Sequence, residues 1–291
     1  MGERDPGVDI LMIGHIAVDQ IVVDGQSETA TGGGVYYGGM ALRQLGISVA
    51  VATRLHPRDF PRLEEMRDAG IRVYATAAEE TSGIENTYRS ANMETRQTRA
   101  LGFAGAFRPE DIPDLPARVV MISPIIAGEV DLPLLARLAR RGPVALDVQG
   151  FVRVRVGEDL VFRPWAEMAE GLRHVTYLKV DHAEAEHLTG LSAPAEAAAR
   201  LAAYGPREVV LTRSEGVLVW AEGEVHRAPF TPRSLVGRTG RGDTCFSTYV
   251  GWRLDHGAAE AARLAGAVTT LKQERPGPWP GPLSAALERI G

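Results

Sequence analysis

The sequence is poor in residues on which several common activities depend. Among its 291 residues there are one cysteine, Cys245, and two lysines, Lys179 and Lys272. A single cysteine excludes an internal disulfide, and no Gly-x-x-x-x-Gly-Lys segment can be drawn, which excludes a Walker-type phosphate loop. We interpret Cys245 as a small buried residue rather than as a reactive thiol.

An excess of basic charge and long apolar runs are also lacking. The formal net charge is -5 at pH 7, so the chain has no basic field that would attract nucleic acid. No apolar run approaches the roughly 20 residues that span a membrane, and residues 1–7 lack the apolar segment of a signal peptide. We therefore expect a cytoplasmic protein that binds neither nucleic acid nor a membrane.

Short apolar runs alternate with helical patterns along most of the chain. Strands are predicted at residues 9–13, 48–53, 71–74, 118–123, 143–147, 174–179 and 208–212, and helices at 35–45, 61–69, 132–141, 164–171, 183–189, 195–203 and 258–271. Such alternation is typical of parallel βαβ units. We predict an α/β fold with a mostly parallel central sheet, formed by one domain over residues 1–291.

The most informative stretch is residues 236–253, which read Val-Gly-Arg-Thr-Gly-Arg-Gly-Asp-Thr-Cys-Phe-Ser-Thr-Tyr-Val-Gly-Trp-Arg. A glycine-rich turn here runs into a helical pattern. The first amides of a helix have no intrahelical partner and lie at the positive end of its dipole, so they bind phosphate oxygens. Gly240 and Gly242 allow close approach of such an anion. Asp243, a carboxylate among these amides, would either ligate a metal or accept a proton from an acceptor hydroxyl.

This stretch resembles the C-terminal signature of the ribokinase-like carbohydrate kinases (the phosphofructokinase-B family), Asp-Thr-x-Gly-Ala-Gly-Asp. The residues that carry the resemblance are Thr239, Gly240, Gly242 and Asp243. Two positions depart from it, with Gly237 in place of Asp and Arg241 in place of Ala. The resemblance implies a ribokinase-like three-layer fold, with helices on both faces of the sheet and a small β lid. It also implies Asp243 as the general base, with residues 240–242 holding the transferred phosphoryl group.

A second glycine-rich turn resembles the N-terminal signature of the same family. It consists of Gly32, Gly33 and Gly34 and leads into the predicted helix at 35–45. The resemblance implies that this turn binds the acceptor together with Asp19, whose carboxylate would accept hydrogen bonds from hydroxyls. Tyr37 stands where ribokinase itself has a substrate-binding Asn, which argues against a plain ribose site.

Further site residues are implied by the resemblance alone. Gln149 and Arg153 would lie between the acceptor and the phosphates, Thr212 and Gly216 beside the nucleotide, and Ala267 at the wall of an adenine pocket.

Asp181 and Glu184 are the candidate metal ligands. They resemble the family's Asn-x-x-Glu segment, with Asp in place of Asn. Residues three apart share one face of a helix, so both carboxylates could order a hydrated magnesium ion. The same spacing is that of a capping box at the start of a helix, and both interpretations can hold together.

Strands near residues 20–31 and 87–101 would form the lid. The first of these ranges holds the Asp24-Gly25 turn, which indicates a hairpin. The lid strands would have exposed edges that can pair with another chain. We therefore expect either a monomer or a homodimer that forms through the lid.

We predict an ATP-dependent kinase that transfers the γ-phosphoryl group to a hydroxyl of a small polyhydroxy substrate. A sugar or a cyclitol such as inositol is favoured over a nucleoside. Magnesium is the expected cofactor, and a monovalent cation is a further candidate. The alternative is a non-catalytic nucleotide- or sugar-binding regulatory protein of the same fold, which the departures at Tyr37, Gly237 and Arg241 would favour.

Overall fold

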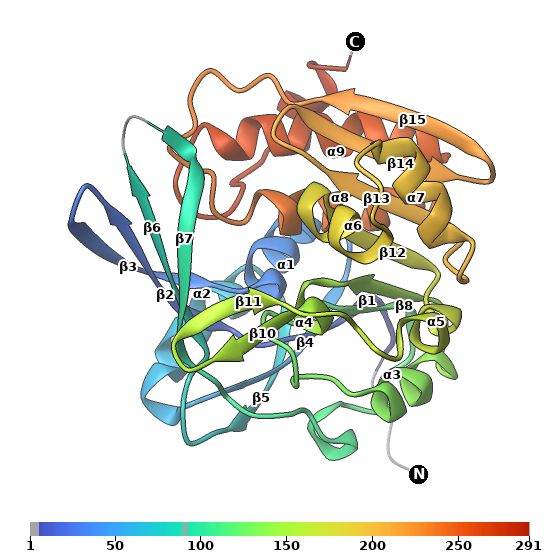
Figure 1. The fold of residues 1–291 in the computed structure, drawn as a ribbon. Helices are drawn as coiled ribbons and strands as arrows, with labels where there is room; N and C mark the ends of the chain where they lie inside the picture. The colour runs from blue at the N-terminus through green and yellow to red at the C-terminus, as the bar shows by residue number, and fades with distance from the viewer. Residues whose placement is uncertain (1–5, 90–91, 291) are drawn as a thin grey trace.

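A nine-stranded sheet forms the centre of the molecule (Figure 1). The structure is a computed structural model and describes residues 6–89 and 92–290. The strands of this sheet are β1 (Val8–Ile13), β4 (Val49–Leu55), β5 (Arg72–Ala77), β8 (Ala117–Ile122), β9 (Val144–Asp147), β12 (Tyr177–Asp181), β13 (Glu208–Thr212), β14 (Gly216–Ala221) and β15 (Glu224–Pro229). Their order is β15-β14-β13-β12-β9-β8-β1-β4-β5. Pairing is parallel from β13 to β5 and antiparallel at β14 and β15.

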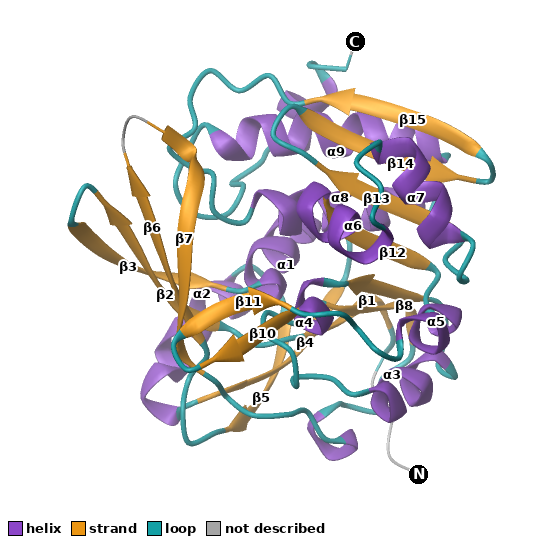
Figure 2. Ribbon diagram, viewed as in Figure 1, coloured by secondary structure: helices purple, strands orange, loops and turns teal. Residues whose placement is uncertain are grey.

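Helices cover both faces of this sheet (Figure 2). One face packs against α3 (Leu132–Ala139), α5 (Met168–Gly171), α6 (His182–Thr189) and α7 (Pro194–Ala202), and the other against α1 (Gly34–Gln44), α2 (Glu64–Asp68), α8 (Arg241–Arg253) and α9 (Ala258–Gln273). Side chains of a strand alternate between faces, and in β1 Leu11 joins one apolar core while Ile10 and Met12 join the other. The predicted α/β fold with a mostly parallel sheet is confirmed.

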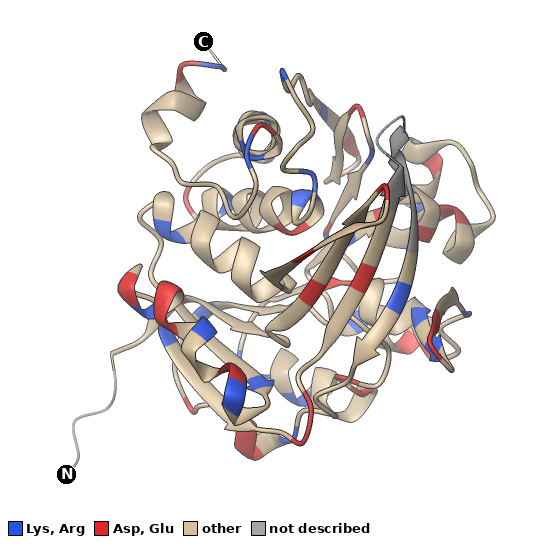
Figure 3. Ribbon diagram, turned by 90° about the vertical axis from the view of Figure 1, so that its left-hand side faces the viewer, with Lys and Arg blue, Asp and Glu red and all other residues tan. Residues whose placement is uncertain are grey.

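A second, six-stranded sheet projects beside the first. Its strands are β2 (Ala17–Val23), β3 (Gln26–Gly32), β6 (Gly83–Arg89), β7 (Asn92–Gly102), β10 (Arg153–Val156) and β11 (Asp159–Phe162), in the order β10-β11-β7-β6-β2-β3. The ranges 20–31 and 87–101 fall in β2, β3, β6 and β7, except that residues 90 and 91 lie outside the described residues. Charged residues are spread over this sheet (Figure 3), and Arg99 pairs with Glu85 and Glu158 across its strands.

Two hairpins and part of two helices differ from the sequence-based prediction. The hairpins β10–β11 and β14–β15 were not expected, although each turns at a glycine with positive φ, Gly157 or Gly223. The predicted helix at 61–69 begins as a 3₁₀ helix over Pro57–Leu63, because Pro61 cannot donate an amide hydrogen bond. The helix predicted at 164–171 is confined to α5. Each described helix is too short or too polar to cross a lipid bilayer.

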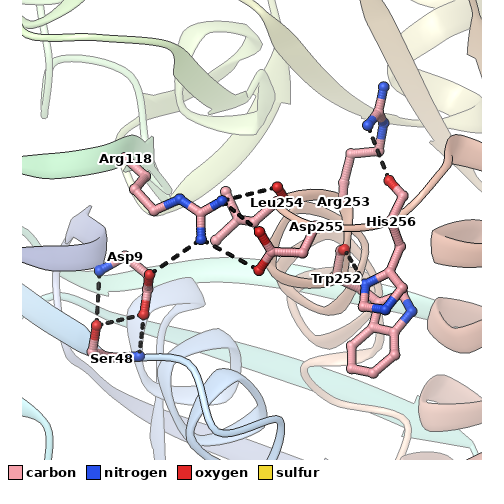
Figure 4. Close-up of polar contacts among 8 residues, drawn as sticks. All are labelled: Asp9, Ser48, Arg118, Trp252, Arg253, Leu254, Asp255 and His256. Atoms are coloured by element: carbon pink, nitrogen blue, oxygen red, sulfur yellow. Dashed lines mark hydrogen bonds and ion pairs between the residues drawn. The ribbon is translucent and has the colours of Figure 1, made fainter.

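The C-terminal end of α8 is tied to the amino edge of the central sheet (Figure 4). Arg118, at the start of β8, donates to Asp255 at 2.7 Å and to the Leu254 carbonyl at 2.9 Å. The same guanidinium reaches Asp9 in β1 at 3.4 Å, and Asp9 accepts from the Ser48 amide at 2.9 Å. With this end of α8 at the amino edge, its N-terminus lies at the carboxyl edge.

Helices α1 and α8 cross in close contact through glycines. A β-carbon at Gly38 in α1 would collide with the hydroxyl of Ser247, and one at Gly251 in α8 would collide with Leu42. Interiors packed at crystal-like density do not accommodate such atoms without movement. The two glycines therefore set the distance between the helices.

We expect Gly38→Ala to lower the free energy of unfolding by about 1–3 kcal/mol, because the added methyl group overpacks the α1–α8 contact. Gly257→Ala is the matched control, since no atom lies within 4 Å of a β-carbon built there. Urea unfolding measures the free energy of unfolding of both variants, which can be compared through their midpoints if the m-value is unchanged. Equal midpoints for the two variants would contradict the close-packing account.

Candidate active site

A cavity of about 410 Å³ lies where the two sheets meet. Residues at or just after the carboxyl ends of β9, β12 and β13 line one side of it, and β2 and β6 contribute the other. Ligands of open α/β sheets bind at this edge, beyond the carboxyl ends of the strands. The two turns singled out from the sequence both reach the cavity.

Most of the predicted site residues share this cavity. Those that line it are Asp19, Gly33, Gly34, Tyr37, Gln149, Arg153, Asp181, Thr212, Thr239, Gly240, Arg241, Gly242 and Asp243. Four others lie outside its described lining: Gly32, Glu184, Gly216 and Ala267.

The turn of residues 237–243, called here the anion turn, opens α8. Gly240 precedes the helix with φ 80°, a conformation that glycine adopts without strain. Its Cα faces the ring of Tyr37 so closely that a β-carbon would collide with the ring. In the described structure no side chain caps α8. The Arg241 amide donates to the Arg238 carbonyl at 3.1 Å, and the next amides, those of Gly242 and Asp243, are available to an anion.

Asp243, in the first turn of α8, meets the second glycine turn. A β-carbon at Gly34 would lie 3.0 Å from Asp243 Oδ1 and 2.8 Å from Ser123 Cβ. Both α8 and α1 therefore begin at the same point of the cavity, with a carboxylate between them. Such a carboxylate can accept a proton from a hydroxyl bound there.

Asp19 lies in β2 and is 6% exposed. Its Oδ1 accepts a hydrogen bond from the Ile84 amide of β6 at 2.9 Å. Gly32 lies against the same carboxylate, and a β-carbon there would overlap Asp19 Oδ2. Gly32 thus makes room for Asp19 and does not itself reach the cavity.

Asp181 and Glu184 form a complete capping box at the start of α6. Asp181 Oδ1 accepts from the Glu184 amide at 2.8 Å, and Glu184 Oε2 accepts from the Asp181 amide at 2.7 Å. Glu184 is 0% exposed and lies 3.5 Å from Lys179 Nζ, which also bonds Asp147 at 3.1 Å. Of the predicted metal pair, only Asp181 can contact a ligand in the cavity.

Two residues predicted for the nucleotide site lie outside the described lining of the cavity. Ala267 is buried in a cluster with Leu264, Val268 and Trp279. Gly216 closes the turn after β13 by accepting the Arg213 amide at 2.9 Å. It therefore shapes the cavity indirectly, whereas Thr212 lines it.

The departure at Gly237 has a steric reason. A β-carbon there would collide with the carbonyl oxygen of Arg275 and lie 2.6 Å from that of Lys272. The Gly237 amide donates to the Gln273 carbonyl at 2.8 Å. The end of α9 occupies the space that the usual aspartate would require.

Several cavity residues were not identified from the sequence. They include Asn86, Ser123, Lys179, Arg213, Ser214 and Arg238. Asn86 comes from β6, which is distant in sequence from the glycine turns, so only the fold brings it near. Arg213 and Arg238 border recognised motifs, and their charge was the available signal.

Electrostatics also distinguish Asp243. Burial raises the pKa of its carboxyl above the ordinary value, and the nearby Asp147 carboxylate raises it further. The positive charges of Lys179, Arg153 and Lys272 oppose this shift. A raised pKa makes the ionised carboxylate a stronger base.

We expect Asp243 to titrate above 3.8, the ordinary value for an aspartate. Asp147→Asn should lower the Asp243 pKa, because it removes a negative neighbour and leaves the charge of Lys179 less neutralised. Carboxyl ¹³C NMR of protein labelled at aspartate measures both effects, with Asp255→Asn as a control at the far end of α8. A midpoint at or below 3.8, or one insensitive to Asp147→Asn, would refute this account.

The chain is similar to known carbohydrate and nucleoside kinases. A profile of the pfkB family carbohydrate kinases matches residues 8–281. The cytidine kinase of Thermococcus kodakarensis is 28% identical over 248 residues, which are 81% of this chain and 85% of that protein. A pyrophosphate-dependent kinase in the ribokinase family, solved as a sulfate complex, is 34% identical with TM-score 0.89, covering 96% of this chain and 99% of that one.

Two further solved structures are similar. A pyrophosphate-dependent kinase in the ribokinase family, complexed with a pyrophosphate analog and myo-inositol, has the same identity, coverage and TM-score. Arabidopsis thaliana ribokinase complexed with ribose and ATP is 18% identical with TM-score 0.76, covering 98% of this chain and 99% of its own. The second likeness concerns the fold alone.

Proposed function

Since this chain belongs to the pfkB family of carbohydrate kinases, it is a phosphotransferase that acts on an alcohol group. We propose that its phosphoryl donor is inorganic pyrophosphate and that its acceptor is a cyclitol such as inositol. The observation that carries the donor assignment is the charge of the cavity. Its described lining holds Arg153, Lys179, Arg213, Arg238 and Arg241. The prediction of ATP stays a prediction, and the assay below tests it.

A compact polyanion suits this lining. Pyrophosphate concentrates several negative charges on few atoms, and guanidinium groups bind phosphate oxygens in a bidentate manner. Thr239 and the first amides of α8 add uncharged donors beside these groups. ATP would need an apolar surface for its base, and the one predicted for it, Ala267, is buried in the core.

The acceptor end of the cavity suits a ring of hydroxyls. Asp19, Asn86, Ser123 and Gln149 line it with carboxylate, amide and hydroxyl groups. Tyr37, the aromatic side chain in the described lining, already packs against Gly240. A cyclitol needs only polar partners, whereas a nucleoside base would also need a stacking surface.

Asp243 and the anion turn would perform the transfer together. The acceptor oxygen forms a bond to the transferred phosphorus while the bridging P–O bond of pyrophosphate breaks. The hydroxyl proton passes to Asp243, and orthophosphate leaves. The amides of Gly242 and Asp243 stabilise charge on the transferred group, because they point at it before the reaction begins.

Magnesium would be held mainly through the donor. No cluster of three or more His, Cys, Asp or Glu residues able to hold an ion is found in residues 6–89 and 92–290, and magnesium often relies on phosphate oxygens, waters and one or two carboxylates. Asp181 faces the cavity and would contribute, with Glu184 orienting it from behind. When bound, the ion neutralises charge on the phosphate oxygens.

We expect inositol phosphate and orthophosphate to form from inositol, magnesium and pyrophosphate, with ATP at equal concentration at least tenfold slower. ³¹P NMR detects both products directly. A panel of sugars, cyclitols and cytidine tests the acceptor. Faster turnover with ATP would overturn the donor assignment, and pyrophosphate binding without turnover of any acceptor would favour the regulatory alternative.

Asp243→Asn should lower turnover by about 10²–10⁴-fold, because the acceptor hydroxyl loses its base. Pyrophosphate binding, measured by calorimetry, should persist, since the amides and arginines remain. Asp114→Asn neutralises an exposed carboxylate outside the described lining of the cavity and should leave turnover unchanged. Turnover unaffected by Asp243→Asn would remove Asp243 from the role of base.

A further inference from the structure

Lys272 has no part in the mechanism above, yet it is a buried charge beside the site. It lies in the last turn of α9 and is 1% exposed. Among the residues that the structure describes, no carboxylate lies within the 4.0 Å of an ion pair from its ammonium group. A buried cation without such a partner is destabilising, so its presence calls for a reason other than stability.

The contacts of Lys272 join the start of the anion turn to its middle. Its Nζ donates to the Gly237 carbonyl at 2.5 Å, and it lies 5.0 Å from the centre of the Tyr37 ring. The same ring faces Gly240, where it leaves no room for a side chain. Cations are attracted to the faces of aromatic rings, so one ammonium group holds the start of the turn directly and its middle through Tyr37.

We infer that Lys272 is a positioning residue for phosphoryl transfer, whose ammonium group holds the anion turn in shape and places a fixed positive charge behind it. This inference rests on the proposed function. Lys272 does not line the described cavity, so it acts through Gly237, Tyr37 and the field at Asp243. In a medium of low dielectric the positive charge of the Lys272 ammonium group acts over several ångströms. It would therefore attract the negative charge of the transferred phosphoryl group.

The titration of Lys272 gives an independent signature. Burial lowers the pKa of its ammonium group to about 8, and the Asp243 carboxylate on α8 opposes the shift. The phenol of Tyr37 on α1 also faces this ammonium group. As pH rises through this pKa, the fixed charge is lost, and kcat/KM for the donor should fall.

The first test compares Lys272→Met with Gln273→Met. Gln273 is the control position, because it is a buried neighbour of Lys272. Its backbone carbonyl accepts a hydrogen bond from the Gly237 amide, and substitution of the side chain leaves that carbonyl in place. We expect Lys272→Met to lower kcat/KM for pyrophosphate by about tenfold to a hundredfold, as for loss of one electrostatic contact to a transition state. The KM for inositol should change less than twofold, and Gln273→Met should match the wild type.

Stability separates positioning from a structural role. Lys272→Met should unfold at a urea concentration at least as high as the wild type, because it removes a buried charge. Unchanged turnover, or a loss of stability that parallels the loss of activity, would overturn the inference.

The charge itself is tested by pH and by rescue. Lys272→Arg should move the alkaline limb of kcat/KM above its wild-type midpoint of about 8, since arginine stays charged. Ethylammonium chloride should restore part of the turnover of Lys272→Ala, and sodium chloride at equal ionic strength should not. A limb unmoved by Lys272→Arg, or the absence of rescue, would count against a role for the charge.

A binding experiment keeps this inference separate from the proposed function. Methylenediphosphonate, a non-hydrolysable analogue of pyrophosphate, is titrated calorimetrically into the wild type, Lys272→Met and Gln273→Met. Weaker binding only in Lys272→Met supports the inference even if the wild type turns over no acceptor, in which case the proposed function fails by itself. Equal binding in all three proteins overturns it.

Discussion

The close crossing of α1 and α8 is the contact on which the site depends. Glycines at the crossing, Gly38 and Gly251, leave no space between the helices beyond that filled by Ser247 and Leu42. Both helices begin at the carboxyl edge of the sheet, so their separation there places Gly34 beside Asp243. A few tenths of an ångström at the crossing would change the distance between the proposed base and any hydroxyl bound over Gly34.

Positive charge around this point is arranged in two layers. Arginines and Lys179 line the cavity, where a bound polyanion can contact them. Lys272 lies behind the anion turn and contacts backbone and ring atoms instead. Buried cations of this kind lower stability, and proteins retain such features where activity requires them.

Much of the central sheet could be predicted from the sequence because its strands are buried on both faces. A continuous apolar run such as residues 9–13 is visible without knowing its neighbours. The hairpins β10–β11 and β14–β15 were not predicted. Alternation of polar and apolar residues, a recognised hairpin signal, is present in β10 but absent from β14, which is a continuous apolar run. The strands of both hairpins are short and follow motifs that were interpreted as site or turn residues. The helix expected at 61–69 starts later, at α2, because the residues up to Leu63 form a 3₁₀ helix that contains Pro61.

The sequence by itself determined the alternation of strands and helices, the two glycine turns and the position of Asp243 at a helix start, because these depend on neighbours within a few residues. Only the tertiary structure decided which residues share the cavity. Asn86 of β6 lines the cavity, whereas Ala267 is buried in the core. Lys272 donates to the carbonyl of Gly237, 35 residues away in the chain. Contacts between distant segments depend on packing and strand order, and neither can be predicted from a local sequence pattern.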